Sequence, residues 1–446
     1  MAEAQRRNTL VVSLALLTSL AVFGCSPEAS TDDEAVLVAR TRGIHERVIT
    51  LDTHNDIDPS NFTTERNYTR DLGNQVNLPK MEAGGLDVSW MIVYVGQGEI
   101  TDEGFENAHA QAIEKFEAIH RLTEEIAPDR IELALTSDDV RRISASGKKV
   151  AMIGIENAYQ VGTDLDNIRD FAARGGRYMS LSHNGHSQFA DSNTGERDGL
   201  WLHDGLSELG RQAVAEMNRW GIMVDVSHPS KQSNMQAMEL SRAPVIASHS
   251  AARAMNDHSR NLDDEHLFAL EATGGVVQTV AFSSYVNGPK NTAYNEAVQA
   301  LTAEVAAAMD FEILGGRGGR GALQAMTPAA REAYRQGLGR VQAAVAPRIE
   351  LEVVPVAPPV DVADFVDHID YLVDLIGIDH VGISSDFDGG GGVSGWNDAS
   401  ETFNVTLELV RRGYSEEEIG KMWSGNLLRV LDEVQRVAAE FQEGNR

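Results

Sequence analysis

Eight short apolar runs, each rich in β-branched residues, alternate along this chain with longer stretches of amphipathic, helix-like period. This alternation is typical of βα units on a parallel sheet, and eight such units are the number found in a (β/α)8 barrel. With 446 residues, 42% of them hydrophobic, the chain can bury a core of that size. We therefore expect an α/β fold, a (β/α)8 TIM barrel, with strands at residues 48–53, 88–95, 150–155, 178–182, 222–227, 245–248, 275–282 and 381–385.

Side chains that can bind a metal follow six of the eight predicted strands. His54 and Asp56 come at the end of the first strand, and residues i and i+2 of a strand point to the same side. The carboxyl ends of the strands form one face of a barrel, where catalytic residues gather. Each residue alone has an ordinary explanation, such as a hydrogen bond, a helix cap or an Asp-rich turn, but their joint placement favours a metal site. The set is His54, Asp56, Glu156, His183, His228, His249 and Asp386.

Cysteine content and charge exclude several alternatives. Cys25 is the only cysteine, so the folded domain has no internal disulfide and no thiolate ligand. Any metal must therefore be held by His, Asp and Glu. The formal net charge of −29 argues against nucleic acid as a partner and against charge-driven binding to an anionic membrane.

The N-terminus has the pattern of an export signal. Arg6 and Arg7 precede an apolar stretch at residues 10–23, which is too short to span a bilayer comfortably. The stretch ends at Cys25 in a sequence that resembles a bacterial lipoprotein cleavage site, although Phe23 departs from that pattern; the alternative is an ordinary signal peptide. We expect residues 1–25 to be the signal and residues 26–40 a flexible tether. The protein would then be exported to the periplasmic side of a bacterial envelope and lipid-anchored at Cys25, with the outer membrane favoured by Ser26.

The remaining residues, 41–440, are expected to form one catalytic domain that carries an insertion at about residues 286–360. The insertion contains a Gly-Arg run at residues 315–321. No strand precedes this run and no Gly-Lys-Ser follows it, so a flexible surface excursion is favoured over a nucleotide-binding loop. The flanking residues 295–314 and 328–344 are predicted to be helical and to form a lid or an oligomer contact. Any homodimer would rest on packing alone.

Nine short segments between residues 51 and 430 carry a family resemblance in the family's order. On these segments the chain resembles the membrane dipeptidase, or renal dipeptidase, family of zinc peptidases. They are Leu51-Asp52-Thr53-His54-Asn55-Asp56, Gln75-Val76-Asn77-Leu78-Pro79, Gly154-Ile155-Glu156, Ser182-His183-Asn184 with Phe189-Ala190-Asp191-Ser192, Asp225-Val226-Ser227-His228, Ala247-Ser248-His249-Ser250, Ser259-Arg260-Asn261-Leu262, Gly382-Ile383-Ser384-Ser385-Asp386-Phe387-Asp388-Gly389 and Gly425-Asn426-Leu427-Leu428-Arg429-Val430.

The resemblance implies a barrel of the amidohydrolase type with two Zn²⁺ ions. Carried onto this sequence, His54 and Asp56 bind one ion, His228 and His249 bind the other, and Glu156 bridges both. Two divalent cations held close together bind a hydroxide between them, lower the pKa of that water and polarise the scissile carbonyl. The implied activity is hydrolysis of dipeptides.

The resemblance also assigns roles around the metals. Asp386 moves a proton from the attacking water to the leaving amine, and His183 stabilises the oxyanion. Arg260 binds the free C-terminal carboxylate, and Tyr285 lies near a substrate-contacting position. Family members tolerate a D-residue on the C-terminal side, and some open β-lactam rings. The alternatives are a hydrolase of the same barrel type that acts on another amide, a lactone or a phosphoester, and an exported lipoprotein that binds without turnover.

Overall fold

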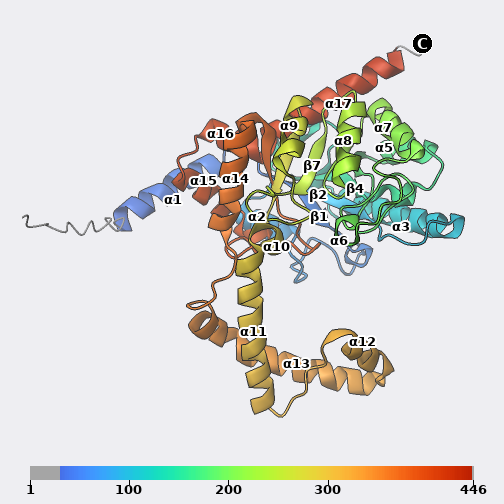
Figure 1. The fold of residues 1–446 in the computed structure, drawn as a ribbon. Coiled ribbons are helices and arrows are strands. Elements are labelled where there is room, and N and C mark those ends of the chain that lie inside the picture. Colours follow the sequence, from blue (N-terminus) through green and yellow to red (C-terminus); the bar gives the residue numbers. More distant parts are fainter. Residues whose placement is uncertain (1–30, 444–446) are drawn as a thin grey trace, which may run out of the picture.

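A parallel barrel forms the centre of the molecule, as a computed structural model that describes residues 31–443 shows (Figure 1). Its strands pair side by side in the order β1-β2-β4-β5-β6-β7-β8-β9, and every pairing is parallel. Each of the eight strands overlaps a predicted one, so the (β/α)8 prediction is confirmed. The bounds are β1 (Leu51–Asp56), β2 (Val88–Tyr94), β4 (Lys149–Glu156), β5 (Gly176–Ser180), β6 (Met223–Asp225), β7 (Ile246–Ser250), β8 (Val276–Val280) and β9 (Val381–Ser384).

The first and last strands of the barrel meet through side chains as much as through backbone. The backbone ladder between them is a single bridge, in which the amide of Asp56 donates to the carbonyl of Phe387 at 2.9 Å. Beside it, the buried carboxylate of Asp52 on β1 accepts hydrogen bonds from the amide of Ser385 at 2.9 Å and from its hydroxyl group. The barrel is therefore nearly closed by backbone pairing, and Asp52 completes the junction.

Helices surround the barrel, and the last of them covers the end at which the strands begin. The apolar face of α17 packs with buried residues of the strands, among them Leu51 and Trp90. This packing seals the end from which the strands start, so the carboxyl ends of the strands are left for the site. The surrounding helices are α2 (Leu78–Gly84), α3 (Asp102–Arg121), α4 (Ser137–Ala145), α5 (Asp166–Ala173), α6 (Gly195–Asp198), α7 (Glu208–Trp220), α8 (Lys231–Leu240), α9 (Asp264–Ala272), α10 (Ser283–Val286), α14 (Val362–Ile376), α15 (Phe403–Arg411), α16 (Glu416–Gly420) and α17 (Asn426–Glu443).

Two strands differ from expectation for local reasons. The fifth predicted strand, residues 222–227, stops at Asp225, because the Asp225 carboxylate accepts a hydrogen bond from the amide of Ser227 at 3.1 Å in place of a ladder partner. A ninth strand, β3 (Ile131–Leu133), was not predicted, since three residues carry too little pattern to detect. It pairs with β4 outside the barrel order.

The N-terminal helix corrects the prediction of a tether over residues 26–40. Residues from Thr31 onward form α1 (Thr31–His45), because the helix packs on α15. Glu34 pairs with Arg411 at 2.9 Å, and buried His45 lies 2.8 Å from the hydroxyl of Thr406. The predicted signal segment and Cys25 lie outside the described residues. Within residues 31–443, no helix is both long enough and apolar enough to cross a membrane.

The insertion forms a helical arm that projects away from the barrel (Figure 1). The two predicted helices are present as α11 (Gly288–Ala308) and α13 (Pro328–Arg348). The Gly-Arg run, predicted to be flexible, instead enters a third helix, α12 (Gly316–Ala325). Leu301 and Val305 of α11 pack on Val341 and Val345 of α13 in a hydrophobic cluster separate from the barrel core. The arm is thus stabilised largely by its own core.

Candidate metal centre

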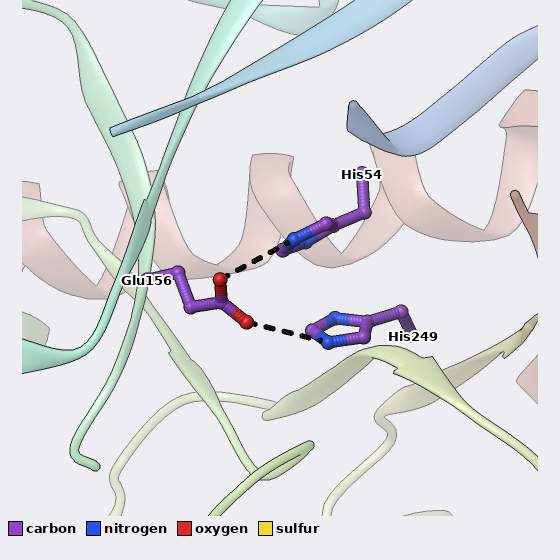
Figure 2. A group of neighbouring side chains, drawn as sticks. All are labelled: His54, Glu156 and His249. Atoms are coloured by element: carbon purple, nitrogen blue, oxygen red, sulfur yellow. Dashed lines mark ion pairs between the residues drawn. The ribbon is translucent and has the colours of Figure 1, made fainter. Parts of the chain in front are cut away.

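The four other predicted metal ligands converge around the buried carboxylate of Glu156. Glu156, at the end of β4, is 3% exposed, and its Oε1 lies 2.9 Å from Nε2 of His228 and 3.4 Å from Nε2 of His249. Its Oε2 lies 3.7 Å from Nε2 of His54, which in turn lies 3.8 Å from Oδ2 of Asp56. Figure 2 shows the rings of His54 and His249 facing the two oxygens of Glu156. The fold thus brings the expected bridging carboxylate between histidines from different strands.

The hydrogen bonds around His54 fix its tautomer, so that the proton is on Nδ1 and the lone pair is on Nε2. The phenol of Tyr178, on β5, donates its one proton to the carbonyl of Thr53 at 3.0 Å. It must therefore accept from Nδ1 of His54, 2.9 Å away, which leaves Nε2 unprotonated in the neutral ring. This Nε2 is buried without a hydrogen-bond partner. A buried lone pair of this kind fits a metal ligand.

A second chain of hydrogen bonds fixes His249. The hydroxyl of Ser248 donates to Asp225 at 2.6 Å and accepts from Nδ1 of His249 at 2.8 Å. Nε2 of His249 then also carries its lone pair, and it lies 2.9 Å from Nε2 of His228. Two imidazole lone pairs repel each other at that distance unless a proton or a cation lies between them. The donor set of imidazole and carboxylate groups fits Zn²⁺.

The electrostatics also favour a cation. Burial would raise the pKa of Glu156, but the imidazoles around it, His183 foremost, hold that pKa well below its usual range. Burial would lower the pKa of His54, but the carboxylate of Glu156 outweighs it and raises the pKa to about 9. Burial, with Glu156 adding to it, raises the pKa of Asp56 to about 6. Without metal, protons on His54 and Asp56 therefore offset part of the negative charge of the site. Bound cations would offset that charge in their place.

The loop after β9 places Asp386 against the cluster. Burial raises the pKa of Asp386 to about 8. Both Asp386 and Asp388 have left-handed backbone, with φ of 60° and 61°, a conformation that Asp tolerates better than most residues. Asp388 accepts from the amide of Gln75 at 2.8 Å, which ties the loop down. A Cβ atom at Gly389 would collide with the carboxylates of Asp386 and Asp56, so only glycine leaves their space open.

A cavity of about 560 Å³ opens above this cluster. Nε2 of His183 lies 3.7 Å from Oε1 of Glu156, so His183 stands at the edge of the candidate metal centre. Tyr285 lines the cavity and stacks on Phe282 at a centroid distance of 4.1 Å. The lining residues within the described chain are Asp56, Ile57, Asp58, Asn61, Tyr68, Asn74, Tyr94, Lys115, Glu156, His183, Asn184, His228, His249, Phe282, Tyr285, Asp386, Asp388 and Gly389. None of them belongs to the arm, so the predicted lid does not reach the cavity in this conformation.

Arg260 lies beside the cavity, not on its wall. Its guanidinium donates to the carbonyl of Ser227 and to that of His249, the latter at 3.1 Å. The charged group is 5.5 Å from the ring centre of Tyr285, and its Nε is buried without a partner. Arg260 lines a second cavity of about 670 Å³ instead. The carbonyls at the ends of β6 and β7 therefore hold the predicted carboxylate clamp just behind the site.

Sequence reasoning missed three residues that shape the site. Tyr94 ends β2 and is the register partner of Glu156, so the rule that found the other strand-end residues could have found it. Tyr178 lies inside β5, where an aromatic residue suggests core packing. Lys115 comes from α3, away from any strand end. The last two carried no local signal of a role at the site.

A closed parallel barrel with imidazoles and carboxylates clustered at the carboxyl ends of its strands defines a metal-dependent hydrolase of the (β/α)8 class. The chain belongs to the membrane dipeptidase family, peptidase family M19, whose family model matches residues 38–445. It is therefore a metallo-dipeptidase, a hydrolase that acts on peptide bonds.

Known proteins agree with this assignment. The chain is 30% identical over 376 residues to dipeptidase tcpJ of Claviceps purpurea, covering 83% of this chain and 72% of that protein. It is 29% identical over 460 residues to dipeptidase aclJ of Aspergillus oryzae, covering 98% and 91%. The crystal structure of the probable dipeptidase PvdM from Pseudomonas aeruginosa is 33% identical, with a TM-score of 0.72 over 91% of this chain and 100% of that one.

Proposed function

We propose that this enzyme hydrolyses dipeptides with two Zn²⁺ ions. His54 and Asp56 would hold one ion, His228 and His249 the other, and Glu156 would bridge them. The observation that carries the proposal is that Glu156 directs one oxygen toward His228 and His249 and the other toward His54. A buried carboxylate with both oxygens engaged in this way is suited to span two cations.

The residues around the ions supply the remaining chemistry. Bound divalent cations act as Lewis acids and lower the pKa of water. Asp386 lies beside His54 and Asp56, where its carboxyl group would take a proton from the attacking water and deliver it to the departing amine. His183 lies close enough to Glu156 to reach the oxygen of a carbonyl over the ions and to stabilise its developing charge.

The other side of the cavity would hold the substrate's C-terminal carboxylate. Tyr285 lines that side, and Arg260 lies behind it with an unpaired Nε–H. A carboxylate entering here would draw the Arg260 guanidinium away from the backbone carbonyls, because a charged acceptor binds it more strongly. Tolerance of a D-residue at this position follows from the family resemblance and belongs to the same proposal.

The test begins with the metal content of the enzyme purified from residue 27 onward. We expect about two zinc ions per chain and turnover of L-L and L-D dipeptides but not of matched tripeptides. Asp386→Asn should abolish turnover and keep the metal. Asp379→Asn, which changes an ion pair with Lys421 on the surface, is the matched control and should change nothing. One zinc per chain, or a preference for tripeptides, would contradict the proposal.

We also propose that the chain is exported and anchored by a lipid on Cys25. The support is the N-terminal sequence alone, since Cys25 lies outside the described residues. Metabolic labelling with a radioactive fatty acid should mark the wild-type protein and not Cys25→Ser. Equal labelling of both would reject the anchor, and retention of the unprocessed chain in the cytoplasm would reject export.

A further inference from the structure

Lys115 differs from every other lysine of the chain. The six others each form an ion pair with a carboxylate: Lys80, Lys148, Lys149, Lys231, Lys290 and Lys421. Lys115 forms none with any described residue, and its ammonium donates one hydrogen bond, to the carbonyl of Ile57 at 2.9 Å. An ammonium has three protons, so this group is under-satisfied on the protein side.

The free ammonium faces the catalytic cavity. Lys115 is the only lysine or arginine among the lining residues, which otherwise include five carboxylates. Its Nζ lies 5.8 Å from the ring centre of Tyr94, and that ring lies 4.6 Å from the ring of His183. One wall of the cavity thus runs from the oxyanion-stabilising histidine, over a tyrosine, to an unpaired cation.

This wall lies opposite the carboxylate clamp. Lys115 is on the helix that follows β2, and Arg260 is in the segment that follows β7. In the barrel order β1-β2-β4-β5-β6-β7-β8-β9, strands β2 and β7 are separated by four steps in either direction around the ring. A dipeptide with its C-terminal carboxylate toward Arg260 and its scissile carbonyl over the metals therefore extends its amino-terminal residue toward Lys115.

We propose that Lys115 forms a subsite for an anionic side chain on the amino-terminal residue, so that the enzyme prefers dipeptides that begin with Glu or Asp. The inference rests on the proposed function, because it uses that substrate direction. A charge-assisted hydrogen bond to a partly buried ammonium is strong, and Lys115 is the only lysine or arginine among the described lining residues that could donate one. Specificity for acid over amide would thus depend on this one side chain.

The test compares Glu-Ala with Gln-Ala, which differ only in charge at the relevant position. In the wild type kcat/KM should favour Glu-Ala over Gln-Ala, and in Lys115→Met this ratio should fall by about 10-fold to 100-fold. Lys115→Glu should instead favour Lys-Ala. Lys148→Met is the matched control, because Lys148 pairs with Glu132 outside the cavity and should leave the ratio unaltered.

A purely structural Lys115 gives a different result. If the ammonium serves only to hold the Ile57 carbonyl, Lys115→Met lowers kcat/KM for both substrates equally, and the proposal is wrong. A measurement of dipeptide binding tests the subsite independently of turnover. If neither dipeptide is turned over, the proposed function fails, but the subsite stands if Glu-Ala raises the Tm of the zinc-loaded enzyme more than Gln-Ala and Lys115→Met removes that difference. Equal Tm shifts would reject the subsite too.

Discussion

Tyr178 on β5 reaches across the barrel interior to His54 on β1, with 2.9 Å between the phenol oxygen and Nδ1. The phenol is itself anchored, because it donates to the carbonyl of Thr53. Its ring also stacks on Trp90 at a centroid distance of 5.1 Å. One candidate metal ligand is therefore positioned by the packed core beneath the site and not by the loops around it.

Replacing that phenol should weaken metal binding without unfolding the barrel. Tyr178→Phe keeps the ring and removes the acceptor for Nδ1 of His54, so His54 can turn or change tautomer. Loss of such a supporting hydrogen bond typically costs 10-fold to 100-fold in metal affinity, roughly, and we expect that loss here. Zinc affinity measured by competition with a chelator checks it. Tyr159→Phe removes a buried hydroxyl bonded to Glu99, away from the ligands, and is the control. Equal affinities in the two variants would contradict this role for Tyr178.

Gly389 should tolerate no side chain. In Gly389→Ala the new methyl group meets the carboxylates of Asp386 and Asp56, so one of them must move. A displacement of about 1 Å at a catalytic group can cost on the order of 100-fold in rate, and we expect kcat to fall by about that factor. Gly339→Ala on α13, where a Cβ meets nothing within 4 Å, should leave kcat unchanged and raise stability slightly. Unaltered kcat in Gly389→Ala would show that the loop can shift freely.

The metal-free protein should lose stability as pH rises from about 6.5 to about 9. In the folded state His54 keeps its proton to a pKa of about 9 and Asp386 to about 8, whereas the unfolded chain releases both at lower pH. The folded state therefore binds more protons in this window, and the free energy of unfolding falls as those protons leave. We expect a loss of at least about 1 kcal/mol.

Urea unfolding in a chelator at several pH values measures this change. Asp386→Asn should remove the part of the slope that ends near pH 8. Added zinc should flatten the slope, because the cation replaces the protons and binds more tightly as pH rises. A metal-free protein whose stability rose over the same range would show that these groups are already deprotonated without metal.

The arm should be dispensable for catalysis. Its hydrophobic cluster is its own, and none of its described residues lines the cavity. Its two ends are close, since Lys290 at the start of α11 reaches Asp361 at 3.3 Å. Replacing residues 291–359 by a flexible linker of about six residues should leave zinc content and dipeptide kcat/KM unchanged. A fall in kcat/KM with full zinc content would indicate that the arm reaches the substrate in solution.

The sequence predicted the parts of the site that follow from barrel geometry. His54, Glu156 and His249 follow buried strands, and the carboxyl ends of parallel strands must share one face. The position of Arg260 could not be predicted, because its guanidinium binds the carbonyls of Ser227 and His249, which only the folded barrel brings together. Lys115 was missed for a related reason: its place depends on how α3 packs, which no residue pattern near position 115 reveals.

The junction between Asp52 and Ser385 joins residues 333 positions apart. Until the last strand is made and docked, β1 has one unpaired edge, and His54 and Asp56 on that strand cannot meet Asp386. The candidate metal centre is thus complete only after β9 and the loop that follows it have docked beside β1. A nascent or partly folded chain would lack this centre, so peptide hydrolysis is delayed until the protein is whole.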